Sequence, residues 1–331
     1  MVTGKPRTML LNALKKVKLS AHAEEFLPYA RPCVQFTYQQ STEKYGVGTS
    51  RVGGLPELPE SVEWPEGCNE KGKAEGHAEF VAQLNFAELP VVEGLDLPRN
   101  GYLWLFVRNS KLIYKPAVVL FRNSEVELKR ATELGTGYGG SKLRRGAGLT
   151  FRPGVSLPFS SKAFNRRFGE FSLSQLAEEL ASGMDSYGDM AGISGQIGGY
   201  SYQAEYDLAR EFAMEELGRG DYWKVDHWNS IEDMEREIKH GNPFLARINP
   251  EADKERRKTL KRDLPKLEWI VENDEKIQRI ADSFHLLCMF RPDMLVGLYF
   301  GDGMYLDFLV KGESLRKRDF SGVKAACLML L

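Results

Sequence analysis

Two glycine pairs constrain the fold of this chain more than any other feature of the sequence. The pairs are Gly53-Gly54, in the stretch RVGGLP, and Gly198-Gly199, in the stretch QIGGYS. Two strand-like apolar segments come after each pair, at residues 80–86 and 101–107 after the first and at residues 285–290 and 303–310 after the second. This recurrence predicts a degenerate duplication. A chance match is the alternative, because Gly-Gly beside an apolar residue is common.

The length and the charge balance of the chain indicate how many domains it forms and which class of partner it does not bind. With 331 residues, the chain is long enough for two domains or for one large duplicated domain. Its 45 basic and 46 acidic residues leave a formal net charge of -1, far from the strong positive charge of a dedicated nucleic-acid-binding protein. We therefore expect a folded globular protein that does not bind nucleic acid.

The apolar segments and the cysteines indicate where in the cell the protein is expected. Residues 9–14 form too short an apolar run for a secretory signal, and no stretch approaches the roughly 20 apolar residues of a membrane span. Cys33, Cys68, Cys288 and Cys327 are scattered along the chain. We expect reduced thiols, a cytoplasmic location and no membrane partner.

The pattern along the chain predicts three regions. Residues 1–30 form a helical segment, because apolar residues recur there at helical spacing. Residues 31–160 form a first β-rich repeat, where period-two alternation and short apolar runs indicate strands. Residues 161–331 form a second repeat, which contains a charged helical insertion at about 202–283.

Helix start signals support this insertion. Ser230, followed by Asp233, is a predicted cap, and Gly241 ends the helix that it begins. Asn249 and Pro250 are a cap and a first helical residue, and they lead into a strongly charged run that reaches Arg262. A further cap is predicted at Ser172, before a helix rich in leucine.

Motifs for nucleotide binding and covalent catalysis are incomplete. The glycine-rich segment 135–142 resembles a phosphate-binding loop, but Ser141 separates its last glycine from Lys142, where a Walker loop has lysine directly after glycine. The segment around Ser194 lacks the final glycine of a nucleophile elbow. We therefore predict no catalytic nucleophile.

Candidate metal ligands and acid–base residues are equally sparse. Cys68 and His77 are a single pair of ligands, which is too few to close a tetrahedral zinc site. Four carboxylates could serve as acid and base if the fold brings them together, and a surface location is the alternative; they are Asp185, Asp189, Asp302 and Asp307. We expect no cofactor and no metal, and a binding protein rather than an enzyme.

One polar segment, residues 218–229, is unusually rich in aromatic side chains. Tyrosine, tryptophan and arginine are enriched where binding energy concentrates at protein interfaces. The predicted partner-binding residues are Tyr222, Trp223, Asp226 and Trp228. Packing of these rings onto their own domain is the alternative interpretation.

Six short motifs, taken in order, resemble the YwqG-like family, bacterial proteins grouped under a domain of unknown function. They occur at residues 50–59 with Trp64 and Pro65, and at residues 82–85, 101–103, 196–200, 301–305 and 318–321. The resemblance implies an α+β fold: a mainly antiparallel β roll built from two degenerate repeats, with peripheral helices. It carries no established reaction.

The resemblance also suggests a role, because related proteins are found beside polymorphic toxins and are thought to act as immunity proteins. The leading hypothesis is a cytoplasmic protein that binds a cognate toxin and blocks its active site. The alternative is an enzyme or small-molecule-binding protein that uses a cleft between the two repeats. The residues predicted to line that cleft are Gly53, Gln83, Gly198 and Asp302.

Overall fold

A computed structural model of the chain describes residues 2–39, 46–69, 71–108, 114–115, 117–123, 126–130, 146–159, 161–171, 173–182, 193–201, 207–228, 230–293, 296, 298 and 305–327. The chain divides into two compact units. The first, which we call the sheet unit, comprises Met1–Glu205 and His285–Leu331. The second, the helical unit, comprises Tyr206–Phe284. Each unit is described separately below.

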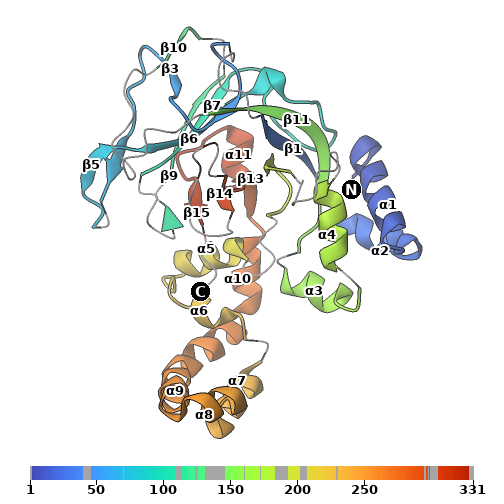
Figure 1. The fold of residues 1–331 in the computed structure, drawn as a ribbon, viewed down its shortest axis with the longest axis vertical. Helices are drawn as coiled ribbons and strands as arrows, with labels where there is room; N and C mark the ends of the chain where they lie inside the picture. Colours follow the sequence, from blue (N-terminus) through green and yellow to red (C-terminus); the bar gives the residue numbers. More distant parts are fainter. Residues whose placement is uncertain are drawn as a thin grey trace. The chain divides into compact units, whose positions relative to one another are not determined.

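Fifteen strands are present in the described part of the chain (Figure 1). They are β1 (Arg31–Gln39), β2 (Arg51–Val52), β3 (Glu57–Pro59), β4 (Glu66–Cys68), β5 (Ala74–His77), β6 (Glu79–Asn85), β7 (Tyr102–Val107), β8 (Tyr114–Lys115), β9 (Ala117–Arg122), β10 (Leu128–Arg130), β11 (Ala147–Ser156), β12 (Gly195–Ile197), β13 (Phe284–Phe290), β14 (Leu306–Lys311) and β15 (Lys324–Ala326).

The helices fall into two groups. Those of the sheet unit are α1 (Gly4–Lys16), α2 (Ala23–Phe26), α3 (Lys162–Phe168), α4 (Leu173–Ser182) and α11 (Gly312–Lys317), with single 3-10 turns η1 (Ser20–His22), η2 (Leu27–Tyr29) and η3 (Phe86–Glu88). Those of the helical unit are α5 (Leu208–Glu216), α6 (Trp223–Asp226), α7 (Ile231–His240), α8 (Pro243–Ile248), α9 (Pro250–Glu272) and α10 (Asp274–Ala281).

Eleven strands form one sheet in the order β8-β15-β14-β13-β12-β1-β11-β2-β6-β7-β9. Two pairs, β10-β3 and β4-β5, lie outside it. Every pairing whose register is described is antiparallel. The expected mixture of helices with a mainly antiparallel sheet is therefore confirmed.

The sheet is nearly closed on itself. Strands β8 and β9 stand at opposite ends of the strand order, yet Lys115 of β8 and Ala117 of β9 are two positions apart in the sequence. Two residues of extended chain span at most about 7 Å. The two edges must therefore lie close together, and the sheet has to curl in a barrel-like manner.

The longest ladder of this sheet joins β1 to β11. It runs from the pair Arg31 and Ser156 to the pair Gln39 and Gly148 without a shift in register. Beyond it, β12 pairs with β1, and β2 pairs with β11. The two sides of the sheet are thus joined through β1 and β11.

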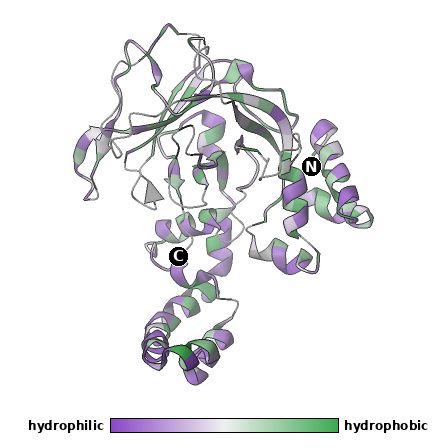
Figure 2. Cartoon of the chain, in the orientation of Figure 1, coloured by the Kyte–Doolittle hydropathy of each residue, from purple (hydrophilic) through white to green (hydrophobic). Residues whose placement is uncertain are grey.

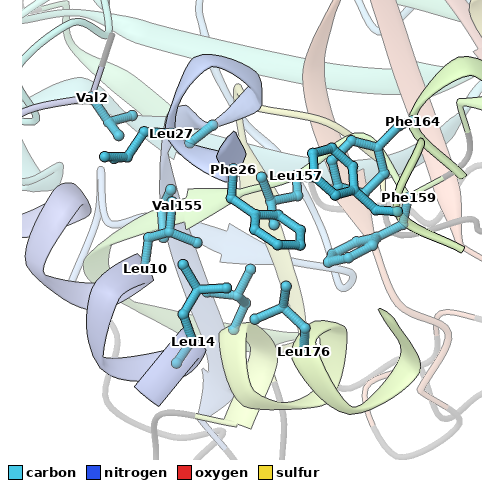
Figure 3. Packing of buried hydrophobic residues seen from close by; sticks show 14 residues of the cluster. Val2, Leu10, Leu14, Phe26, Leu27, Val155, Leu157, Phe159, Phe164 and Leu176 are labelled. Carbon is cyan, nitrogen blue, oxygen red and sulfur yellow. The ribbon is translucent and has the colours of Figure 1, made fainter. Parts of the chain in front are cut away.

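An apolar cluster lies between the N-terminal helices, β11 and α4 (Figure 3). Leu10 and Leu14 of α1, Phe26 of α2 and Leu176 of α4 are each completely buried in it. The ring of Phe26 stacks on that of Phe168 with centroids 4.3 Å apart. The apolar spacing that predicts a helical segment in residues 1–30 thus corresponds in part to α1, which spans Gly4–Lys16.

Local caps determine where the helices of the helical unit begin. The side chain of Ser230 accepts from the backbone nitrogen of Asp233, and α7 ends at Gly241, whose φ is 75°. Asn249 caps α9. This helix does not stop near Arg262 but continues to Glu272 with Pro265 inside it, because its apolar side chains pack into the core of the unit.

Truncating Phe26 tests the packing of the N-terminal helices. Phe26→Ala removes a fully buried ring from between α1 and α4, so we expect the free energy of unfolding to fall by about 3–5 kcal/mol. Urea unfolding measures this change. Val91→Ala, at a side chain that is 71% exposed, is the matched control and should leave the stability within about 0.5 kcal/mol of the original. Equal effects of the two substitutions would contradict the packing.

Candidate functional site

The two glycine pairs have the same backbone conformation. Gly53 and Gly54 follow β2 with φ of 63° and 69°, and Gly198 and Gly199 follow β12 with φ of 72° and 74°. These angles lie in the left-handed region, which residues with a side chain rarely adopt. Both pairs therefore mark turns that favour glycine.

Each pair also packs closely against a loop that belongs to the other half of the strand order. A Cβ atom on Gly53 would lie 2.6 Å from the carbonyl oxygen of Val296, a residue that follows β13. A Cβ atom on Gly198 would lie 2.6 Å from a methyl carbon of Leu95, a residue that follows β6. Close packing of the chain accounts for these glycines without a ligand.

Three of the four residues predicted to line a cleft are among the described residues, and the structure does not bring these three together as one group. Gly53 follows β2, which pairs with the strand that carries Gln83. Gly198 follows β12, and both β1 and β11 lie between β12 and β2 in the sheet. Asp302 lies outside the described residues. Two of the four, Gly53 and Gln83, are therefore neighbours.

Gln83 is fully buried and uses both ends of its amide. Its Oε1 accepts hydrogen bonds from Trp104 Nε1 at 3.0 Å and from the backbone nitrogen of Glu57 at 3.1 Å. Its Nε2 donates to the backbone oxygen of Thr49 at 3.1 Å. Gln83 lies on β6, and its hydrogen bonds thus hold the segment after β2 against β6 and β7.

A buried ion pair completes this network. Glu57 is fully buried, pairs with the guanidinium of Arg51 and accepts from the backbone nitrogen of Gly48 at 2.7 Å. Removing either charge would leave the other buried without its partner, which is strongly destabilising. The pair was not recognised from the sequence, because the glycine turn and Pro56 separate its members. We assign it a structural role.

A second group of ionisable side chains lies where β1, β13 and β14 approach one another. Its members are Tyr38, Arg291, Asp293, Tyr305 and Asp307. The hydroxyl of Tyr38 donates to the backbone oxygen of Arg291 at 2.8 Å. Burial, reinforced by the Asp293 carboxylate, raises the pKa of Tyr38 well above its usual value, and burial with the Asp307 carboxylate raises that of Tyr305. Both phenols therefore stay protonated at neutral pH and can donate hydrogen bonds.

One side of the aromatic segment, residues 218–229, packs against the apolar core of the helical unit. Tyr222, Trp223 and Trp228 are partly buried and pack against the apolar cluster of this unit. The ring of Tyr222 meets that of Trp269 edge to face at 5.4 Å. The guanidinium of Arg219 lies 5.5 Å from the centroid of each of these two rings. Much of the aromatic area therefore stabilises the unit itself.

The fourth predicted partner-binding residue, Asp226, neutralises a buried charge. Arg210, whose side chain is only 5% exposed, pairs with Asp226 at 3.3 Å and with Asp274 at 2.8 Å, and donates to Gln278 at 3.1 Å. Burial opposes the charge on Arg210, but the two carboxylates outweigh it and raise its pKa. Asp226 thus links α6 to α5.

The surface of the helical unit carries an apolar pair that was not singled out from the sequence. Phe244 is 69% exposed and Ile248 is 61% exposed, one turn apart on α8. Arg247, between them in the sequence, is also exposed. Figure 2 shows α8 coloured as hydrophobic over much of its length. The sequence signal was the four-residue spacing of these side chains directly after Pro243.

Comparison with known proteins identifies a family for this chain. A family model described as a domain of unknown function (DUF1963) matches residues 50–327. No curated protein matches the chain. In the part of the chain that the structure describes, no three histidine, cysteine or acidic side chains are grouped to hold a metal ion, and no helix is long and apolar enough to cross a bilayer.

Neutralising Asp226 tests whether this residue is structural. Asp226→Asn leaves Asp274, which is 62% exposed, as the ion-pair partner of the buried Arg210, so we expect the free energy of unfolding to fall by about 3 kcal/mol. Asp274→Asn removes the exposed partner and should cost less than about 1 kcal/mol. Denaturant unfolding of both variants measures the difference. Wild-type stability of Asp226→Asn would show that the carboxylate is available for another purpose.

Proposed function

The chain belongs to the family defined by the domain of unknown function DUF1963, and because that description names no reaction, we propose from its own surface that it is a binding protein. Its partner in this proposal is another protein, a cognate toxin whose active site it covers. The proposal draws on the resemblance to the YwqG-like family and on the exposed side chains of the helical unit.

The exposed pair Phe244 and Ile248 carries the proposal. Large apolar side chains that are exposed next to each other, with an arginine beside them, have the composition of an interface centre. Two side chains bury much less than the roughly 1,000 Å² of a specific interface, so neighbouring surface must contribute. The exposed parts of Tyr222, Trp223 and Trp228 are further candidate contacts, while Asp226 is engaged with Arg210.

The thiols support the cytoplasmic part of the proposal. Cys33, Cys68, Cys288 and Cys327 are all buried, and no disulfide joins any two of them. Burial raises the pKa of Cys33 to about 12, so its thiol stays protonated and unreactive at neutral pH. Four unbridged cysteines suit a reducing compartment.

The arrangement of strands supports the proposed duplication. Strands β2, β6, β7 and β9 are neighbours in that order on one side of the central ladder, and β12, β13, β14 and β15 are neighbours in that order on the other. In both series the first strand is short, and a glycine pair with positive φ comes directly after it. We infer that the two series descend from one repeat.

An alternative function rests on the ionisable group beside β14. Tyr38, Tyr305 and fully buried Asp307, with Arg291 and Asp293, combine proton donors, carboxylates and a cation. Such a set is suited to binding a small polar molecule or to acid–base chemistry. Tight retention of a metabolite by the purified protein would favour this alternative over toxin binding.

Co-expression with a toxin tests the proposal. The genes beside the gene for this chain are first searched for one that encodes a secreted toxin, and the intact protein should restore growth of cells that express that toxin. The double variant Phe244→Ser with Ile248→Ser should lose protection by about a hundredfold in surviving cells, because both side chains leave the interface centre. Its thermal unfolding should match that of the intact protein, since both side chains are exposed.

Val91→Ser, an equally exposed apolar position in the sheet unit, is the matched control and should protect fully. Undiminished protection by the double variant would reject α8 as the binding surface. The absence of any neighbouring toxin gene would reject the toxin as partner.

A further inference from the structure

One end of the sheet presents basic and aromatic side chains on a single face. The register sets Val34 of β1, Ile197 of β12 and Cys288 of β13 in one row. Strands β1 and β13 run in the same direction, because each is antiparallel to β12. Arg31 and His285 each lie three residues before that row, so they share a second row and face the same side.

Tyr200 lies beside Arg31. The guanidinium carbon of Arg31 is 4.2 Å from the centroid of the Tyr200 ring, and the backbone nitrogen of Tyr200 donates to Ser156 Oγ at 2.9 Å. Ser156 is the register partner of Arg31. A guanidinium over an aromatic ring keeps its N–H donors at the edge of its plane, available to a ligand.

A second guanidinium, that of Arg316 on α11, acts on the same imidazole. The imidazole of His285 lies against Gly312, the first residue of α11, so closely that a Cβ atom there would be 2.6 Å from Nε2. Arg316 is one turn further along α11 and lies on the same face as Gly312. Arg31 and Arg316 are both near enough to act electrostatically on His285.

The positive charge at this place is not neutralised within the described residues. Arg31, His285 and Arg316 form no ion pair with a carboxylate in the described ranges of the chain. Burial is the largest cause that lowers the pKa of His285, and the two guanidiniums lower it further. An anion bound beside the two guanidiniums would be attracted by both charges, and it would also favour the protonated form of His285.

We propose that Arg31, Tyr200, His285 and Arg316 form a binding site for a phosphate group. Two guanidiniums and an imidazole offer a charge and a set of donors that suit a dianionic oxyanion. Arg31, Tyr200 and His285 are half-buried and Arg316 is exposed, so the site is open to a ligand from solvent. The site belongs to the sheet unit and does not depend on the toxin-binding proposal.

Proton NMR of the His285 imidazole tests the site, with His285→Gln used to assign its signal among the 5 histidines. Inorganic phosphate should raise the pKa of His285 relative to sodium chloride of equal ionic strength, because a bound dianion stabilises the imidazolium. Arg31→Gln should weaken phosphate binding about tenfold or more, and Arg316→Gln by a smaller factor because its side chain is exposed. Without phosphate, Arg31→Gln should also raise the pKa of His285, because it removes a repelling guanidinium, and thermal unfolding like that of the intact protein should show that the variant keeps its fold.

Arg99→Gln, at an exposed arginine in another loop, is the control and should bind phosphate as the intact protein does. Phenyl phosphate separates two sources of the anion: tighter binding than inorganic phosphate indicates an organic phosphate ester, and weaker binding indicates the free ion. Equal responses of His285 to phosphate and chloride, or equal affinities of the Arg31→Gln and Arg99→Gln variants, would overturn the proposal.

Discussion

The antiparallel ladder between β1 and β11 is the interaction on which the sheet unit depends. It spans all nine residues of β1 without a break, and the strands on either side attach to it through β12 and β2, each only two or three residues long. The short strands cannot hold the two sides together alone, because sheet stability accumulates with each cross-strand pair. The close contacts at Gly53 and Gly198, which join the two sides, therefore depend on this ladder, whereas the row that carries Arg31 and His285 is set by the register of β12 with β1 and with β13.

The sheet and the helices carry different parts of the proposed function. In buried networks such as the one around Gln83, the polar groups form hydrogen bonds with one another inside the sheet unit. These networks therefore hold loops in place rather than bind partners. The phosphate site at Arg31 and the phenols near Asp307 are places of the sheet unit where ionisable groups converge. In the helical unit, the apolar side chains that remain exposed on α8 offer a surface to a partner protein.

Much of the fold was predictable from the sequence, because short-range signals determine it. The caps at Ser230 and Asn249, the apolar run of β7 and the spacing within α1 all act within a few residues. The site was less predictable, because it depends on residues far apart in the chain. The aromatic residues near Trp223 looked like an interface, but sequence could not show that Arg210 needs Asp226 or that the rings cover a core. Arg31 and His285 lie 254 positions apart in the sequence, and only the sheet register brings them together.

Native-state hydrogen exchange of the backbone amides tests the central role of the β1–β11 ladder most directly. If this ladder holds the sheet together, the amides of Val34 to Phe36 open only when the whole sheet unit unfolds, and they should exchange most slowly in that unit. The amides of β9 and β15, near the ends of the strand order, should exchange faster through local opening. Exchange in β1 as fast as in β9 would contradict the account, because it would show that the centre of the sheet opens independently of the rest.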